Sequence, residues 1–254
     1  MDCMSQVLRN IPLLALALVL TVCSGWSQGL STGAAALSAE QIAEQLRSHN
    51  LARANALRHY TAVRHYEVEY RGFPAKLEAR MEVEASYDVK AGKSFRVLAE
   101  SGSKALRDKV LRRALESEIE ASQDPSASAM TTANYRFHLL GSEKLDGRTV
   151  YILDVEPRTK SKFLVRGKIW VDATEFALVK MEAEPGKNPS FWISRTLIQQ
   201  SFAKTGEFWL AAKNRSESKV RLGGTAVLLI DYGNYQIVSD AARQVAGGRG
   251  ERAE

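Results

Sequence analysis

The chain has 254 residues, of which 45% are hydrophobic and 25% are charged, a composition that excludes a largely disordered chain. This length supports one substantial core or at most two small ones. The net charge of +6 is modest, and the sequence has no basic stripe interleaved with aromatic residues. We therefore expect no nucleic acid among the partners.

The N-terminal segment is typical of an export signal. Arg9 precedes an unbroken apolar run from Ile11 to Val22, and small residues follow this run. A run of about a dozen apolar residues is short for a membrane span but suits a secretory signal. We expect residues 1–27 to be a cleaved secretory signal that directs the chain to the periplasm. A retained N-terminal anchor is the alternative.

Both cysteines, Cys3 and Cys23, lie within this segment. Cleavage after Ser27 would leave a domain without a disulfide, a cysteine-ligated metal or a cysteine nucleophile. Residues 20–23 loosely resemble a lipobox, so lipid anchoring at Cys23 is an alternative, although Val22 is bulky for that motif.

The rest of the chain divides into a flexible linker at 28–37, one folded domain at 38–239 and a disordered tail at 240–254. Ser38 and Gln41 form a capping box, which predicts a helix from about Ser38 to Leu57.

After Tyr60 the period of the apolar residues changes to two. Residues 65–71 and 76–87 alternate apolar and charged side chains, which predicts antiparallel strands with one buried and one solvated face. Gly72-Phe73-Pro74 would form the turn between them, and residues 93–101 a third strand.

A second helix is expected from about Ser103 to Gln123, with a wide apolar stripe that includes Leu111, Leu115 and Ile119. The remaining chain shows a series of strands joined by turns, and Asp146-Gly147 is a strong hairpin signal. The expected strands are 135–144, 148–158, 164–172, 177–185, 191–204, 208–218 and 226–238.

These elements predict an α+β fold with about ten strands and two helices. An antiparallel sheet of this size twists and curls strongly. Only two helices are available to cover its apolar face, so we expect a cavity. An interior filled by side chains is the alternative.

Short blocks between Asn134 and Ile237 resemble a known family. The blocks are Gly147-Arg148-x-x-Tyr151, Asp154-Val155-Glu156-Pro157, Gly167-Lys168-Ile169-Trp170-Val171-Asp172, Asn188-Pro189-Ser190-Phe191-Trp192, Phe208-Trp209-Leu210, Asn214-Arg215-Ser216 and Ile230-Asp231-Tyr232. This pattern resembles the bacterial outer-membrane lipoprotein-sorting family, the relatives of the LolA and LolB lipoprotein carriers. The resemblance implies an unclosed β-barrel, covered by helices, whose apolar interior takes lipid acyl chains in the periplasm.

The leading hypothesis is a monomeric periplasmic carrier of lipid or of lipoprotein acyl chains, with inner- or outer-membrane transport components as further partners. The alternative is a periplasmic sensor or regulatory module that binds lipid or a membrane-protein partner. A hydrolase of envelope components ranks last.

Candidate residues for a lipid cavity are apolar and aromatic side chains at alternate strand positions. They are Tyr66, Val68, Tyr70, Leu77, Met81, Val83, Trp170, Met181, Trp192, Phe202 and Trp209. Ordinary core packing is the alternative for each of them. Phe191 and Trp192 are adjacent, so within a strand they would point to opposite faces.

The basic residues Arg158, Lys160, Lys162 and Arg166 are candidates for binding lipid headgroups or an acidic partner. A solvated loop is the alternative. The four histidines lack metal-ligand spacing, and no GxSxG motif occurs. We therefore predict no catalytic residues, no metal and no cofactor.

Overall fold

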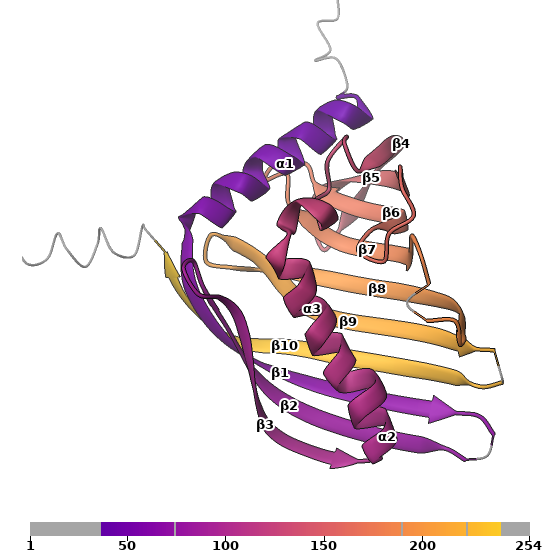
Figure 1. Ribbon diagram of the computed structural model, residues 1–254. Coiled ribbons are helices and arrows are strands. Elements are labelled where there is room, and N and C mark those ends of the chain that lie inside the picture. The colour runs from indigo at the N-terminus through magenta and orange to yellow at the C-terminus, as the bar shows by residue number, and fades with distance from the viewer. Residues whose placement is uncertain (1–36, 74, 189, 222, 240–254) are drawn as a thin grey trace, which may run out of the picture. The chain divides into compact units, whose positions relative to one another are not determined.

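A computed structural model describes residues 37–73, 75–188, 190–221 and 223–239 of the chain (Figure 1). The predicted signal and tail, both cysteines, Pro74 and all of the predicted linker except Leu37 lie outside these residues.

The first helix, α1 (Ala39–Ala56), begins at the predicted capping box. The Gln41 amide donates to Ser38 Oγ at 3.2 Å, and the Ser38 amide donates to Gln41 Oε1 at 2.8 Å. Both bonds satisfy amides that the first turn leaves without a helical partner. The chain passes directly from α1 into the first strand at Leu57, earlier than the sequence predicts.

In the part of the chain that the structure describes, ten antiparallel strands form one sheet, in the order β3-β2-β1-β10-β9-β8-β7-β6-β5-β4. They are β1 (Leu57–Arg71), β2 (Leu77–Asp88), β3 (Gly92–Gly102), β4 (Tyr135–Leu145), β5 (Arg148–Pro157), β6 (Val165–Asp172), β7 (Leu178–Pro185), β8 (Ile193–Thr205), β9 (Phe208–Val220) and β10 (Thr225–Ser239). Within the described residues, β3 and β4 are the two edges and do not pair with each other. The predicted fold class, an unclosed antiparallel sheet with helical cover, is confirmed.

The second helical region joins β3 to β4. It consists of α2 (Lys104–Leu106), a π-helical turn (Arg107–Leu111) and α3 (Arg112–Gln123), followed by a 3-10 turn (Pro125–Ser128). The sequence predicts one continuous helix here. The π turn shifts the helical register, and Ile119, expected on the buried stripe, is 37% exposed.

Cross-strand partners share a face of the sheet, so the register identifies the two faces. The helix-covered face carries, from β2 to β5, Met81, Tyr66, Ile230, Asn214, Gln200, Met181, Ile169 and Leu153. The open face carries, from β1 to β5, Glu67, Leu229, Arg215, Gln199, Glu182, Lys168 and Asp154.

Two apolar clusters fill opposite parts of the helix-covered face. In one, Ile42 and Leu46 of α1 pack against β4–β6. In the other, Leu111 and Leu115 pack against residues of β1, β2 and β10. The helices are thus held by burial of apolar surface at the two sides of the sheet.

Between the clusters, several helix-covered positions of β8 and β9 are polar, although Ile198 lies among them. Asn214 Nδ2 donates to Gln200 Oε1 at 2.8 Å, and Ser216 Oγ donates to Asn214 Oδ1 at 2.9 Å. Thr196 Oγ1 and Ser218 Oγ lie 2.9 Å apart. The expectation of an apolar interior face is therefore wrong at these positions of the two strands. Hydrogen bonds between the side chains offset the cost of burying them.

Candidate functional site

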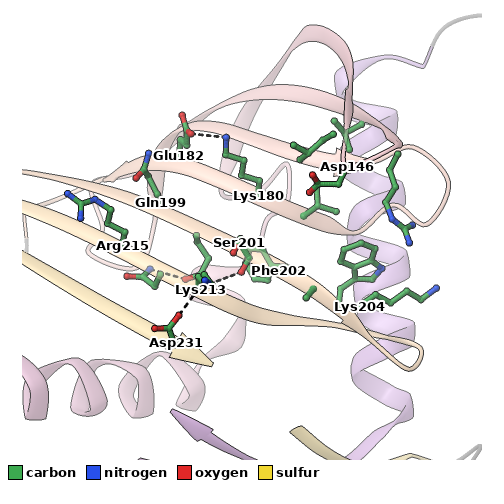
Figure 2. A pocket seen from close by; sticks show the side chains of 18 of the residues that line it. Asp146, Lys180, Glu182, Gln199, Ser201, Phe202, Lys204, Lys213, Arg215 and Asp231 are labelled. Atoms are coloured by element: carbon green, nitrogen blue, oxygen red, sulfur yellow. Dashed lines mark hydrogen bonds and ion pairs between the residues drawn. The ribbon is translucent and has the colours of Figure 1, made fainter. Parts of the chain in front are cut away.

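A cavity of about 820 Å³ lies on the open face, over β5 and β7–β10 (Figure 2). Its apolar wall includes Val150, Val179, Phe202, Trp209 and Leu229. A volume of this size is within the range of ligand-binding pockets.

The strand register brings together side chains that are far apart in the sequence. Asp231 pairs with Lys213, Lys213 with Ser201, and Ser201 with Lys180. Figure 2 shows these side chains on one side of β7–β10, together with Gln199 and Arg215. Two irregularities in the pairing lie beside the cavity, between Ser201 and Phe202 of β8 and between Trp170 and Val171 of β6. Bulges of this kind bend a sheet locally.

Five cations and three carboxylates line the cavity, and each cation is paired with a carboxylate, namely Glu175, Glu182, Glu217 or Asp231. The cations are Arg148, Lys180, Lys204, Lys213 and Arg215, and the carboxylates are Asp146, Glu182 and Asp231. Lys213 Nζ lies 3.9 Å from Asp231 Oδ1, and their side chains are 79% and 64% exposed. Exposed pairs of this kind contribute little to stability, so these groups are available to a charged ligand.

Glu175 fixes the aromatic wall at one side of the cavity. The indole Nε1 of Trp209 donates to Glu175 at 2.9 Å, and Lys204 Nζ donates to the same carboxylate at 2.8 Å. The hydrogen bond from Lys204, and to a smaller extent that from Trp209, lowers the pKa of Glu175. The guanidinium carbon of Arg148 lies 5.2 Å from the centre of the Trp209 ring. The ring is thus held in one orientation by polar and cation–π contacts.

The structure divides the predicted cavity residues between the two faces. Phe202 and Trp209 line the open-face cavity, and Trp170 packs beside it against Val150 and Val179. Under the helices lie Tyr66, Val68, Tyr70, Met81, Val83 and Met181. Leu77 is 37% exposed at the start of β2.

Trp192 and its neighbour Phe191 lie outside the strands. β8 begins at Ile193, so the expectation of a strand from Phe191 is wrong. Ser190 accepts from the Trp192 amide through Oγ at 3.3 Å and from the Ile193 amide through its carbonyl at 3.2 Å. This turn prevents the alternation expected for the pair, and both side chains are exposed.

The predicted basic residues lie at or near the connection between β5 and β6. Arg158 Nε donates to the Thr132 carbonyl at 2.8 Å. Lys162 Nζ lies 2.6 Å from Glu120 of α3, while Lys160 and Arg166 are exposed. None of these four residues lines the open-face cavity, which reaches Asp146 and Arg148 at the opposite end of β5.

Arg64 is a buried charge that the sequence interpretation missed. It is 3% exposed on the helix-covered face, and its guanidinium donates to both carboxylate oxygens of Glu118, at 2.7 and 3.2 Å. Lys93 Nζ donates to the same carboxylate at 2.8 Å. Burial opposes ionisation of Glu118, but the bond from Arg64 and the charges of Lys93 and Arg64 outweigh it and lower its pKa. The alternation of β1 contained the signal, because Arg64 falls in the series of Ala62 and Tyr66.

Within the described ranges, no group of three or more His, Cys, Asp or Glu side chains is placed to hold a metal ion. In the same ranges, no helix is both long enough and apolar enough to span a membrane.

A family model described as a family of unknown function, DUF5686, matches residues 127–235. No curated protein matches the chain. Among solved structures, a DUF1329 family protein from Desulfovibrio piger is 13% identical, with a TM-score of 0.41, and the match covers 81% of this chain and 97% of that one.

Two further structures carry the family name that the sequence blocks resemble. A LolA superfamily protein from Nitrosomonas europaea is 13% identical, with a TM-score of 0.35, over 80% of this chain and 94% of that one. An outer membrane lipoprotein-sorting protein domain from Vibrio parahaemolyticus is 12% identical, with a TM-score of 0.36, over 77% of this chain and 91% of that one.

Proposed function

We propose that the chain is an exported carrier that binds an anionic amphiphile, a lipid or the acyl chains of a lipoprotein, and performs no chemistry on it. One observation carries this proposal. The open-face cavity combines an apolar wall of Phe202, Trp209 and Leu229 with cations at its margin, of which Lys213 is 79% exposed and 3.9 Å from its nearest carboxylate.

The energetics of such a site suit an amphiphile. Each methylene buried against the wall contributes about 0.8 kcal/mol. Lys180, Lys213 and Arg215 would attract a carboxylate or phosphate headgroup. Acyl chain and headgroup would then be bound side by side on the face of the sheet.

The export signal expected at residues 1–27 supports a periplasmic location for a folded domain at 38–239. The resemblance to lipoprotein-sorting proteins supports transport over storage. Of the residues predicted from the sequence, we retain Phe202 and Trp209 as ligand contacts, with Trp170 behind them.

Displacement of a fluorescent fatty acid by oleate tests this proposal. We expect Leu229→Glu to weaken binding at least tenfold, because it places a carboxylate in the apolar wall beside an anionic ligand. Leu229 is 37% exposed, so the substitution should leave the fold intact. The matched control is Leu140→Glu, at a position of β4 that is 53% exposed and outside the cavity lining. Absence of binding by the wild type, or equal loss in both variants, would contradict the proposal.

One observation favours the alternative, a regulatory module that binds a membrane-protein partner. β3 is a sheet edge on which Val97 and Leu98 are 38% and 41% exposed. An edge with exposed apolar side chains can accept a strand from another protein. Substitution of Leu98 by Lys would then abolish partner capture and leave fatty-acid binding unchanged. Loss of fatty-acid binding in that variant would count against a separate partner site.

A further inference from the structure

Four connections between strands lie together at one end of the sheet. They join β1 to β2, β5 to β6, β7 to β8 and β9 to β10, at the right-hand ends of these strands in Figure 1. Tyr70 Oη donates to the Gly223 carbonyl at 2.9 Å and joins the first connection to the last. The Arg221 amide donates to the Trp192 carbonyl at 2.8 Å, and the Gly186 amide donates to the Leu164 carbonyl at 2.6 Å.

We call this region the basic end and define it as residues 71–76, 158–166, 186–195 and 219–225. These segments contain ten cationic residues and no Asp or Glu. The cations are Arg71, Lys76, Arg158, Lys160, Lys162, Arg166, Lys187, Arg195, Lys219 and Arg221.

Four connections at the opposite ends of the strands have the reverse charge. Segments 88–92, 145–148, 172–177 and 205–208 contain five carboxylates and two cations. The carboxylates are Asp88, Asp146, Asp172, Glu175 and Glu207, and the cations are Lys90 and Arg148. The net charge of the chain is therefore distributed unequally along the strand direction.

Several cations of the basic end are not neutralised by neighbours. Arg71 and Lys76 share Glu69, Arg195 contacts Glu184, and Lys162 contacts Glu120. For the other six, the described residues provide no ion pair within 4.0 Å. These six are Arg158, Lys160, Arg166, Lys187, Lys219 and Arg221.

Exposed aromatic side chains lie among these cations. Phe73, Phe191 and Trp192 are 88%, 75% and 54% exposed. The Phe191 and Trp192 rings lie 5.5 Å apart, and the guanidinium carbon of Arg221 lies 5.2 Å from the Phe191 ring centre. Large aromatic groups in these positions gain free energy only when another phase or molecule covers them.

We propose that the basic end docks on the surface of an anionic lipid bilayer. Trp and Phe side chains partition into the interface between headgroups and acyl chains. Each nearby Lys or Arg adds about 1 kcal/mol of attraction to an anionic membrane. The strands would then stand end-on to the membrane with the acidic connections directed away from it, so repulsion of those carboxylates reinforces the orientation. Independently of what occupies the open-face cavity, this surface brings the protein to a lipid source or acceptor.

Co-sedimentation with vesicles tests the proposal. We expect binding to vesicles of phosphatidylcholine with phosphatidylglycerol, and little binding to phosphatidylcholine alone. Neutralising two cations, in Lys219→Gln/Arg221→Gln, should weaken binding about thirtyfold. The variant Phe191→Ser/Trp192→Ser should also weaken it, while the control Leu139→Ser/Leu140→Ser, on exposed positions of β4, should not.

Fatty-acid binding by the same variants separates this proposal from the carrier function. The basic-end variants should retain it, which also shows that they fold. Leu229→Glu should lose fatty-acid binding and keep vesicle binding. Equal binding to neutral and anionic vesicles, capture of acidic proteins without vesicle binding, or unchanged binding by the basic-end variants would overturn the docking proposal.

Discussion

The ion pair between Arg64 and Glu118 connects α3 to the sheet. The Arg64 guanidinium lies between the rings of Phe95 and Tyr232, at 5.1 and 4.9 Å from their centres, and its buried Nε has no hydrogen-bond partner among the described residues. Burial of the charge is costly, and the carboxylate of Glu118, the Tyr66 hydroxyl at 3.4 Å and the aromatic faces compensate it.

Removing the carboxylate should therefore destabilise the fold. We expect Glu118→Gln to lower the free energy of unfolding by about 3 kcal/mol, because Arg64 stays buried without a counter-charge. The control is Glu116→Gln, on an exposed position of the same helix, which should change stability by less than about 0.5 kcal/mol. Urea unfolding measures both values, and equal values would show that the pair does not stabilise the fold.

The same carboxylate makes the free energy of unfolding depend on pH. The pKa of Glu118 is lower in the folded chain than in the unfolded one. The stabilisation that ionised Glu118 gives to the fold is therefore fully present above the pKa of about 4.3 in the unfolded chain. It is lost as the pH falls through the lower pKa of the folded chain. We expect the stability difference between wild type and Glu118→Gln to shrink in acid. A difference that is constant from neutral pH down to pH ~3 would contradict this assignment.

At the scale of elements, the junction of β3 with α2 depends on a close approach of two backbones. Gly102 has φ +82°, and a Cβ atom there would lie 2.8 Å from Ala79 Cα and closer still to the Glu78 carbonyl oxygen. Ser103, the next residue, donates its amide to that carbonyl at 2.7 Å. A larger residue would push the start of the helical region away from β2.

A comparison of two glycines of β3 distinguishes the energetic cost of backbone strain from that of steric overlap. Gly92 has φ +78°, but no atom lies within 4 Å of the position that a Cβ atom would take there. Gly92→Ala should cost about 1 kcal/mol, from backbone conformation alone. Gly102→Ala should cost about 3 kcal/mol, because steric displacement is added. Thermal or urea unfolding measures the stability of both variants. Similar losses of stability in the two would refute the close packing at Gly102.

Most elements could be predicted from local pattern. The capping box located α1, and the alternation of residues 76–87 located β2. The Asp146-Gly147 turn has φ values of +49° and +81°, as a two-residue hairpin with both residues left-handed requires. These features depend on residues that are close together in the sequence, so the sequence alone predicts them.

The candidate site depends on information that local pattern lacks. Alternation shows that a strand has two faces, but the pairing of β8 with β9 decides which face the helices cover. The polar positions Gln200 and Asn214 were therefore not expected under the helices. The position of Trp209 and Tyr66 on opposite faces of the sheet was also not expected. It depends on how strands that are distant in sequence pair in one sheet.

At the scale of the whole molecule, the two ends and the two faces of the sheet differ in character. The helix-covered face carries two apolar clusters and a polar stripe, and a pocket of about 270 Å³ lies between α1 and the first residues of β9. The open face holds the cavity, and the basic end holds ten cations, of which six have no ion pair with any residue that the structure describes. These differences support a protein that approaches a membrane with one end and holds an amphiphile on one face.

Photo-crosslinking with a diazirine-labelled fatty acid tests the central claim most directly. After irradiation of the complex and digestion, mass spectrometry locates the adducts along the chain. We predict adducts in peptides of β8, β9 and β10, including the one that contains Leu229, and their suppression by excess oleate. Adducts confined to α1, α3 and the helix-covered residues of β1 and β2, or no adducts that oleate suppresses, would contradict an open-face binding site.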